Sequence, residues 1–143
     1  MTRPPPPAGH RLAPHTADLI IEAWGPSRTE CCAQAVLALV EAFVHPLDPV
    51  STTPVPFEFE RADDDELIVR LLEEVIYVVE VLGVVPLSAQ IGTVAGGGIA
   101  GHFDVTPVDR VELIGAVPKG VSRHGLYCAQ EGPTWFARAT VDV

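Results

Sequence analysis

The longest periodic stretch of the sequence begins at Asp63-Asp64-Asp65-Glu66 and ends at Gly83. Its apolar residues recur with helical spacing, which predicts a long amphipathic helix at the centre of the core. The predicted buried face consists of Ile68, Leu71, Leu72, Val75, Val79 and Leu82. The acids suit a helix N-terminus, where unpaired amides and the helix dipole favour negative charge. A metal site is the alternative for the three aspartates, and we favour capping.

A second helix is predicted earlier in the chain. Ser27-Arg28-Thr29-Glu30 has the spacing of a capping box. Behind it, Cys32, Val36, Leu39 and Phe43 form one apolar stripe that ends before Pro46. Strands are expected at 19–24, 52–61, 87–94, 99–106, 111–117, 126–130 and 134–143. The glycine run 96–98 lacks the GK[ST] of a phosphate loop, so we expect a hairpin turn there.

This order of elements predicts an α+β fold. Two helices pack on a mainly antiparallel β-sheet, in the order βαβα followed by a β-meander. A chain of 143 residues, 48% of them hydrophobic, is expected to form a single folded domain. Residues 1–9 are expected to form a disordered proline-rich leader, and residues 10–143 the domain.

The formal charge of −10, with 19 acidic and 9 basic residues, restricts the classes of partner. Negative charge repels phosphate, so no unaided binding of RNA or DNA is expected. Divalent cations or a basic protein surface are favoured instead. The longest apolar region, 67–86, carries four charged residues, so we expect no membrane span and a cytoplasmic protein. Cys31, Cys32 and Cys128 lack metal-ligand spacing and are interpreted as small core residues.

The end of the chain concentrates negative charge. If 134–143 is a strand, Val141 and Val143 lie on one face and Asp142 on the other, close to the terminal carboxylate of Val143. If the first and last predicted strands pair, Asp18 approaches this group. Converging carboxylates repel one another, and a divalent cation such as Ca²⁺, Mg²⁺ or Mn²⁺ would relieve the repulsion. A solvated terminus is the alternative.

Other polar residues are weaker candidates. His15 precedes the first predicted strand, and His124 lies at a turn after Lys119. No nucleophile elbow, His-Glu-x-x-His motif or paired-cysteine motif is present in the sequence, so no hydrolytic triad is visible. Taken singly, a histidine is more often a hydrogen-bonded structural residue than a ligand, and a lysine such as Lys119 is most often a solvated surface residue.

The segment from His15 to Gly25, HTADLIIEAWG, resembles the N-terminal signature of the archease family. The acidic start of the second helix, the Lys119-x4-His124 segment and the Asp142-Val143 end are similar to the same family. The likeness covers residues 10–143. The chain departs from the family at Ser122-Arg123-His124, where Thr-Tyr-His is common, and the leader lies outside the likeness.

This resemblance implies a function. Archeases assist a GTP- and manganese-dependent RNA-splicing ligase by promoting its guanylylation and its multiple turnover, and they are not themselves enzymes. The resemblance implies metal ligation by Asp18, Asp142 and Val143. It implies contact with the ligase for Lys119 and His124, and His15 of the opening motif is grouped with them. The alternatives are a small metal-dependent hydrolase using His15 or His124 as general base, and a general chaperone with a broad apolar surface.

Overall fold

The structure, a computed structural model, describes residues 7–13, 18–46 and 51–143. It begins with strands β1 (Gly9–Ala13) and β2 (Asp18–Gly25), helix α1 (Arg28–Glu41), and strands β3 (Val44–Pro46) and β4 (Thr53–Phe59). Helix α2 (Asp64–Leu82) and the hairpin of β5 (Val84–Thr93) and β6 (Ile99–Pro107) follow. The 3-10 turn η1 (Val108–Arg110) then leads to β7 (Val111–Leu113), β8 (Gly120–Glu131) and β9 (Thr134–Asp142). His15 lies outside the described residues.

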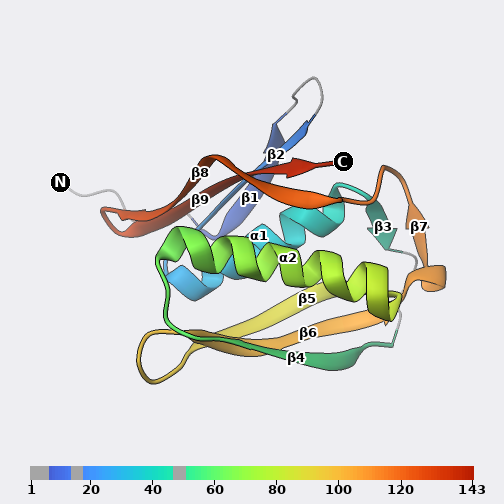
Figure 1. The fold of residues 1–143 in the computed structure, drawn as a ribbon, viewed down its shortest axis with the longest axis horizontal. Coiled ribbons are helices and arrows are strands. Elements are labelled where there is room, and N and C mark those ends of the chain that lie inside the picture. Colours follow the sequence, from blue (N-terminus) through green and yellow to red (C-terminus); the bar gives the residue numbers. More distant parts are fainter. Residues whose placement is uncertain (1–6, 14–17, 47–50) are drawn as a thin grey trace.

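The described strands form three antiparallel sheets, with orders β1-β2-β9-β8, β4-β6-β5 and β3-β7. The two helices lie between the two larger sheets, with α2 in front of α1 in Figure 1. The predicted α+β class and the antiparallel pairing are confirmed. The expectation of one sheet is wrong, because the β5–β6 hairpin joins β4 whereas the β8–β9 hairpin joins β2. A hairpin is specified by neighbouring residues, whereas the choice of the third strand that pairs with it depends on the tertiary structure.

Helix α2 occupies the predicted place and buries most of the predicted face. Ile68, Leu71, Leu72 and Val75 are almost fully buried. Gly83 adopts a left-handed conformation with φ 66°, and its amide donates a hydrogen bond to the carbonyl of Val78, which ends the helix. Leu82 was expected in the core but is 49% exposed, because it lies in the last turn on the solvent side.

Helix α1 begins with the predicted cap. The Ser27 side chain accepts a hydrogen bond from the Glu30 amide at 3.2 Å. Cys31, Cys32 and Cys128 are buried free cysteines, as expected for small core residues. Burial raises the pKa of the Cys31 and Cys32 thiols to about 12, so these thiols stay protonated at neutral pH.

Several strand boundaries differ from the predicted ones. Strands β1 and β3 were not predicted, and β1 starts at Gly9, within the range 1–9 expected as the leader. Strand β8 begins at 120 rather than 126, β5 at 84 rather than 87, and β7 ends at 113. The glycine run does form the predicted hairpin turn between β5 and β6, with φ of 91° at Gly96 and 98° at Gly97.

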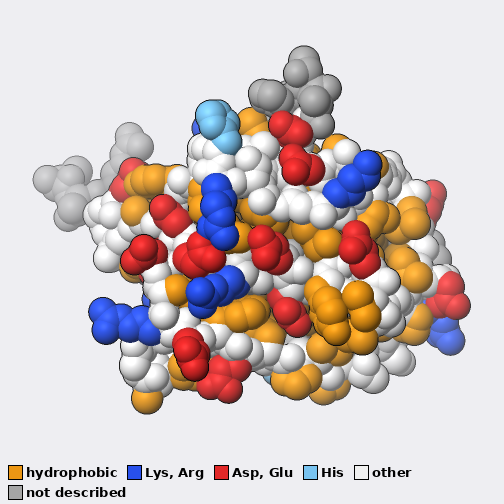
Figure 2. Space-filling view, viewed as in Figure 1, with side chains coloured by type: hydrophobic (Ala, Val, Ile, Leu, Met, Phe, Trp, Pro, Cys, Tyr) orange, Lys and Arg blue, Asp and Glu red, His pale blue; other side chains and the backbone are white. Residues whose placement is uncertain are grey.

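The surface reflects the composition. Acidic side chains are spread over the face that carries α2, with apolar side chains between them (Figure 2). None of the described helices has the length and apolar character needed to cross a membrane.

Candidate divalent-cation site

The hypothesis that the predicted strands 19–24 and 134–143 pair is confirmed, because β2 pairs with β9. Asp18, the first residue of β2, lies directly opposite Asp142, the last residue of β9. Residues opposite each other in an antiparallel pair project from the same face, with Cβ atoms about 4.5–5.5 Å apart. The register therefore brings two carboxylates together from positions that are 124 residues apart in the sequence.

The two aspartates lie on the solvent side of this sheet. The next pair along the two strands, Leu19 and Val141, packs against the core, and Val141 is completely buried. Alternation then places Asp18 and Asp142 on the opposite face. Asp18 is half-buried and Asp142 is exposed. Within the described ranges neither carboxylate forms an ion pair with a basic side chain, so no direct ion pair offsets their repulsion.

The donor chemistry fits a hard divalent cation. Carboxylate oxygens are the ligands that Ca²⁺, Mg²⁺ and Mn²⁺ prefer. Across residues 7–13, 18–46 and 51–143, no group of three or more His, Cys, Asp or Glu side chains is arranged to hold a metal. The register thus brings together two carboxylates, fewer than the three groups that such a cluster requires. Val143 follows β9 directly, and its side chain is 40% exposed.

Lys119 is held next to Asp142 through the backbone. Its amide donates a hydrogen bond to the Asp142 carbonyl at 2.7 Å, and the following residue, Gly120, lies opposite Asp142 in the β8–β9 pair. The backbone at the start of β8 is thus fixed beside the end of β9, and the Lys119 side chain is exposed to solvent there.

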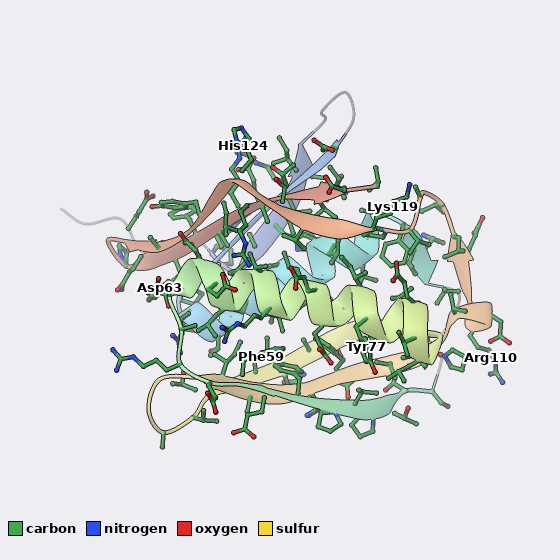
Figure 3. The ribbon with its side chains drawn as sticks, in the orientation of Figure 1. Phe59, Asp63, Tyr77, Arg110, Lys119 and His124 are labelled. Atoms are coloured by element: carbon green, nitrogen blue, oxygen red, sulfur yellow. The ribbon has the colours of Figure 1, made fainter. Side chains whose placement is uncertain are left out.

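His124 reaches the site from an irregularity in β8. Five steps along β8, from Ser122 to Tyr127, face two steps along β9, from Thr140 to Arg138, so β8 carries three extra residues there. His124 projects away from α2 (Figure 3). Its amide donates a hydrogen bond to the Ser122 hydroxyl at 3.1 Å.

Asp18 and His124 line one hollow on the outer face of the β1-β2-β9-β8 sheet. The hollow has a volume of about 360 Å³. Ile20, Gly125, Arg138 and Thr140 complete its lining. The structure therefore brings Asp18, Asp142, Lys119 and His124 to one end of this sheet, whereas His15 lies outside the described residues.

The acids at the start of α2 act differently from the predicted caps. Asp63 occupies the N-cap position but forms no capping hydrogen bond with its side chain. Asp65 accepts a hydrogen bond from the Cys128 amide at 2.7 Å, and Glu66 binds both terminal nitrogens of Arg123. These hydrogen bonds lower the pKa of Glu66. The acids therefore attach β8 to α2 within its irregularity, at Arg123, and directly after it, at Cys128, a role that sequence spacing could not reveal.

Arg123 stands where the resembling family commonly has tyrosine. In this chain its guanidinium holds the residue before His124 against α2. Arg123 thus forms a bidentate ion pair with Glu66, which is half-buried at the start of α2.

Comparison with known proteins gives a consistent result. Residues 10–143 match the sequence profile of the Archease protein family (MTH1598/TM1083). A Mycobacterium tuberculosis protein named probable protein archease is 42% identical over 144 residues, which cover 99% of this chain and 78% of the relative. The protein archease of Pyrobaculum neutrophilum is 23% identical over 144 residues, covering 96% of this chain and 97% of the relative.

Two solved structures share the fold. The solution structure of Methanobacterium thermoautotrophicum protein 1598 superposes with a TM-score of 0.71 at 20% identity, covering 94% of this chain and 99% of that one. A Thermotoga maritima crystal structure, described as an archease and possible chaperone, gives a TM-score of 0.65 at 17% identity. It covers 100% of this chain and 98% of the other.

Proposed function

This chain belongs to the archease family, and from that premise we propose that it is a cation-binding accessory protein of an RNA-splicing ligase. In this proposal it promotes guanylylation and multiple turnover of a GTP- and manganese-dependent ligase and does not join RNA itself. The observation that carries the proposal is the register of β2 and β9, which sets Asp18 opposite Asp142 without a basic partner among the described side chains.

The two aspartates are the proposed side-chain ligands. Asp18 is half-buried and pre-positioned by β2, while Asp142 is exposed and can approach a cation from solvent. The carboxylate of Val143 is the proposed third ligand, since it is covalently next to Asp142. When bound, Ca²⁺, Mn²⁺ or Mg²⁺ supplies a positive charge that attracts further anionic oxygens. Three carboxylates leave part of its coordination open to such oxygens.

Lys119 and His124 are the proposed contacts to the ligase. The backbone hydrogen bond to Asp142 fixes the Lys119 backbone beside that residue. The irregularity in β8 places His124 in the lining of the hollow that also contains Asp18. His15 is grouped with them on sequence resemblance alone. A protein of charge −10 favours a basic partner surface over RNA, so the contacts are expected to be with the ligase protein.

The experiment is a multiple-turnover ligation assay with the RNA-splicing ligase of the same cell. The ligase is held at low concentration against excess RNA ends, with and without this protein. We expect the chain alone to join no RNA and the mixture to complete many more cycles than the ligase alone. An unchanged number of cycles would overturn the proposal.

Two control assays separate the alternatives. Phosphoesterase turnover by the isolated chain with Mn²⁺ would instead indicate a hydrolase. Suppressed aggregation of an unrelated unfolded client would indicate a general chaperone. Arg110→Ala removes an exposed cation from η1 and serves as the matched control for Lys119→Ala. Only Lys119→Ala should lower the stimulation of the ligase.

A further inference from the structure

The outer face of the β1-β2-β9-β8 sheet carries a second hollow, of about 470 Å³, which the proposed function does not use. Its lining is mainly apolar and includes three aromatic residues, Trp24, Tyr127 and Phe136. Trp24 lies directly opposite Phe136 in the β2–β9 register. Tyr127 lies opposite Arg138 on the other side of β9, and 39% of it is exposed. The aromatic side chains thus come from three neighbouring strands of an uncovered sheet face.

Polar groups lie at both ends of this hollow. At the β1 end, Arg11 is already paired with Glu22 at 3.0 Å. At the β8 end, Glu131 accepts a hydrogen bond from the Tyr127 hydroxyl at 2.7 Å and has no basic partner among the described side chains. Arg138, opposite Tyr127 on β9, also lines the hollow, so the excess negative charge is confined to the Glu131 end. An occupant with an apolar body and a cation at that end therefore matches the hollow.

The start of the described chain lies at the edge of the same hollow. Gly9 is opposite Trp24, and a Cβ atom at Gly9 would lie only 2.6 Å from the indole ring, so the indole rests on the Gly9 backbone. The chain bends at Ala8, directly before β1. The segment before Ala8 reads Arg3-Pro4-Pro5-Pro6-Pro7, and it is attached at the Trp24 end of the hollow.

We propose that the aromatic hollow binds the segment 3–7 of the same chain. Consecutive prolines favour the polyproline II conformation, and aromatic-lined grooves are its usual receptors because little conformational entropy is lost on binding. The dimensions agree: β1 to β8 spans three strand spacings, about 14 Å. Five residues of polyproline II extend about 15 Å. A segment leaving β1 and crossing the sheet would bring Arg3 to Glu131.

The two hollows on this sheet face are neighbours, because Arg138 lines both. The inference stands independently of the proposed function, because its basis is the aromatic lining, the attachment point and the charge at Glu131.

The test uses the indole N–H resonances of the full chain in solution NMR. The chain has two tryptophans, and Trp135 lies on the opposite face of the sheet from Trp24 by strand alternation. Replacing Pro4, Pro5, Pro6 and Pro7 by serine should shift the Trp24 indole resonance and leave Trp135 unchanged. A synthetic peptide MTRPPPPAG should then bind this variant and return the Trp24 resonance towards its wild-type position. The same peptide should bind wild type about tenfold more weakly, since the attached segment competes at an effective concentration of millimolar order.

A charge variant tests the direction of the segment. Glu131→Gln should weaken peptide binding to the four-serine variant, whereas Glu112→Gln, an exposed acid on β7, should not. Identical Trp24 resonances with and without the prolines, together with no peptide binding, would overturn the inference. A Trp24 shift that depends on protein concentration, with a doubled mass, would overturn the same-chain assignment in favour of a second copy. Binding only of a foreign proline-rich peptide would overturn it in favour of a partner protein.

Discussion

Removing one of the two opposed carboxylates should stabilise the protein when no divalent cation is present. Two unit charges about 5 Å apart repel by about 0.8 kcal/mol in water and about 3 kcal/mol at an effective dielectric constant of 20. Asp142 is exposed and Asp18 half-buried, so the value lies towards the lower end. We therefore expect Asp142→Asn to raise the free energy of unfolding by about 1 kcal/mol in EDTA.

A divalent cation should make wild type more stable than Asp142→Asn, the reverse of the order expected in EDTA. A ligand present at about one hundred times its dissociation constant stabilises the native state by about 2.7 kcal/mol. Wild type should gain this amount when Mn²⁺ replaces EDTA, because both aspartates remain to bind the ion. Asp142→Asn loses one of the two side-chain ligands and should gain much less. The variant is thus more stable than wild type in EDTA and less stable in Mn²⁺.

The assay is urea unfolding followed by circular dichroism, in EDTA and in MnCl₂. Asp109→Asn is the matched control, because Asp109 is an exposed aspartate on η1. It should respond to Mn²⁺ as wild type does. The reasoning is refuted if Asp142→Asn is less stable than wild type in EDTA and gains as much from Mn²⁺ as wild type.

Three further predictions concern the scaffold. Burial lowers the pKa of His10, but hydrogen bonds to Gln34 and Glu41 outweigh it and raise the pKa above 6.5. Relative to His10→Ala, wild-type stability should therefore be greatest below pH 6.5 and decline as the pH rises through the raised pKa, as measured by urea titrations across pH. Gly101→Ala places a Cβ 1.8 Å from a backbone carbonyl of β5, so its denaturation midpoint should fall by an amount equivalent to about 1–3 kcal/mol, while Gly120→Ala, which meets nothing within 4 Å, serves as the control. The three buried cysteines should react with a thiol reagent at pH 8 only after unfolding, and rapid labelling of the native protein would contradict their assigned burial.

Local signals predicted the elements that depend on neighbours in the chain. Ser27 with Glu30 located the start of α1, and Gly83 located the end of α2. The glycine run gave the β5–β6 turn because only glycine adopts the positive φ angles found there without strain. Strand β1 carried no such signal. Its residues, GHRLA, form a strand because they pair with β2, and pairing is a property of the tertiary structure.

The site was predictable in part for the same reason. Alternation along β9 predicted the side of Asp142, and the hypothesis that the first and last predicted strands pair supplied Asp18. The attachment of β8 through Arg123 and Glu66 could not be predicted, because it depends on three extra residues in β8 that shift the register. Those residues also set the position of His124.

Guanylylation of the proposed ligase partner is the most direct test of the proposed function. The ligase is incubated with labelled GTP and Mn²⁺, and its covalently labelled fraction is followed over time without this protein, with wild type and with Asp142→Asn. We expect faster labelling with wild type and with Asp109→Asn, and a rate near that of the ligase alone with Asp142→Asn. Equal stimulation by wild type and Asp142→Asn, with both proteins folded, would contradict the proposal.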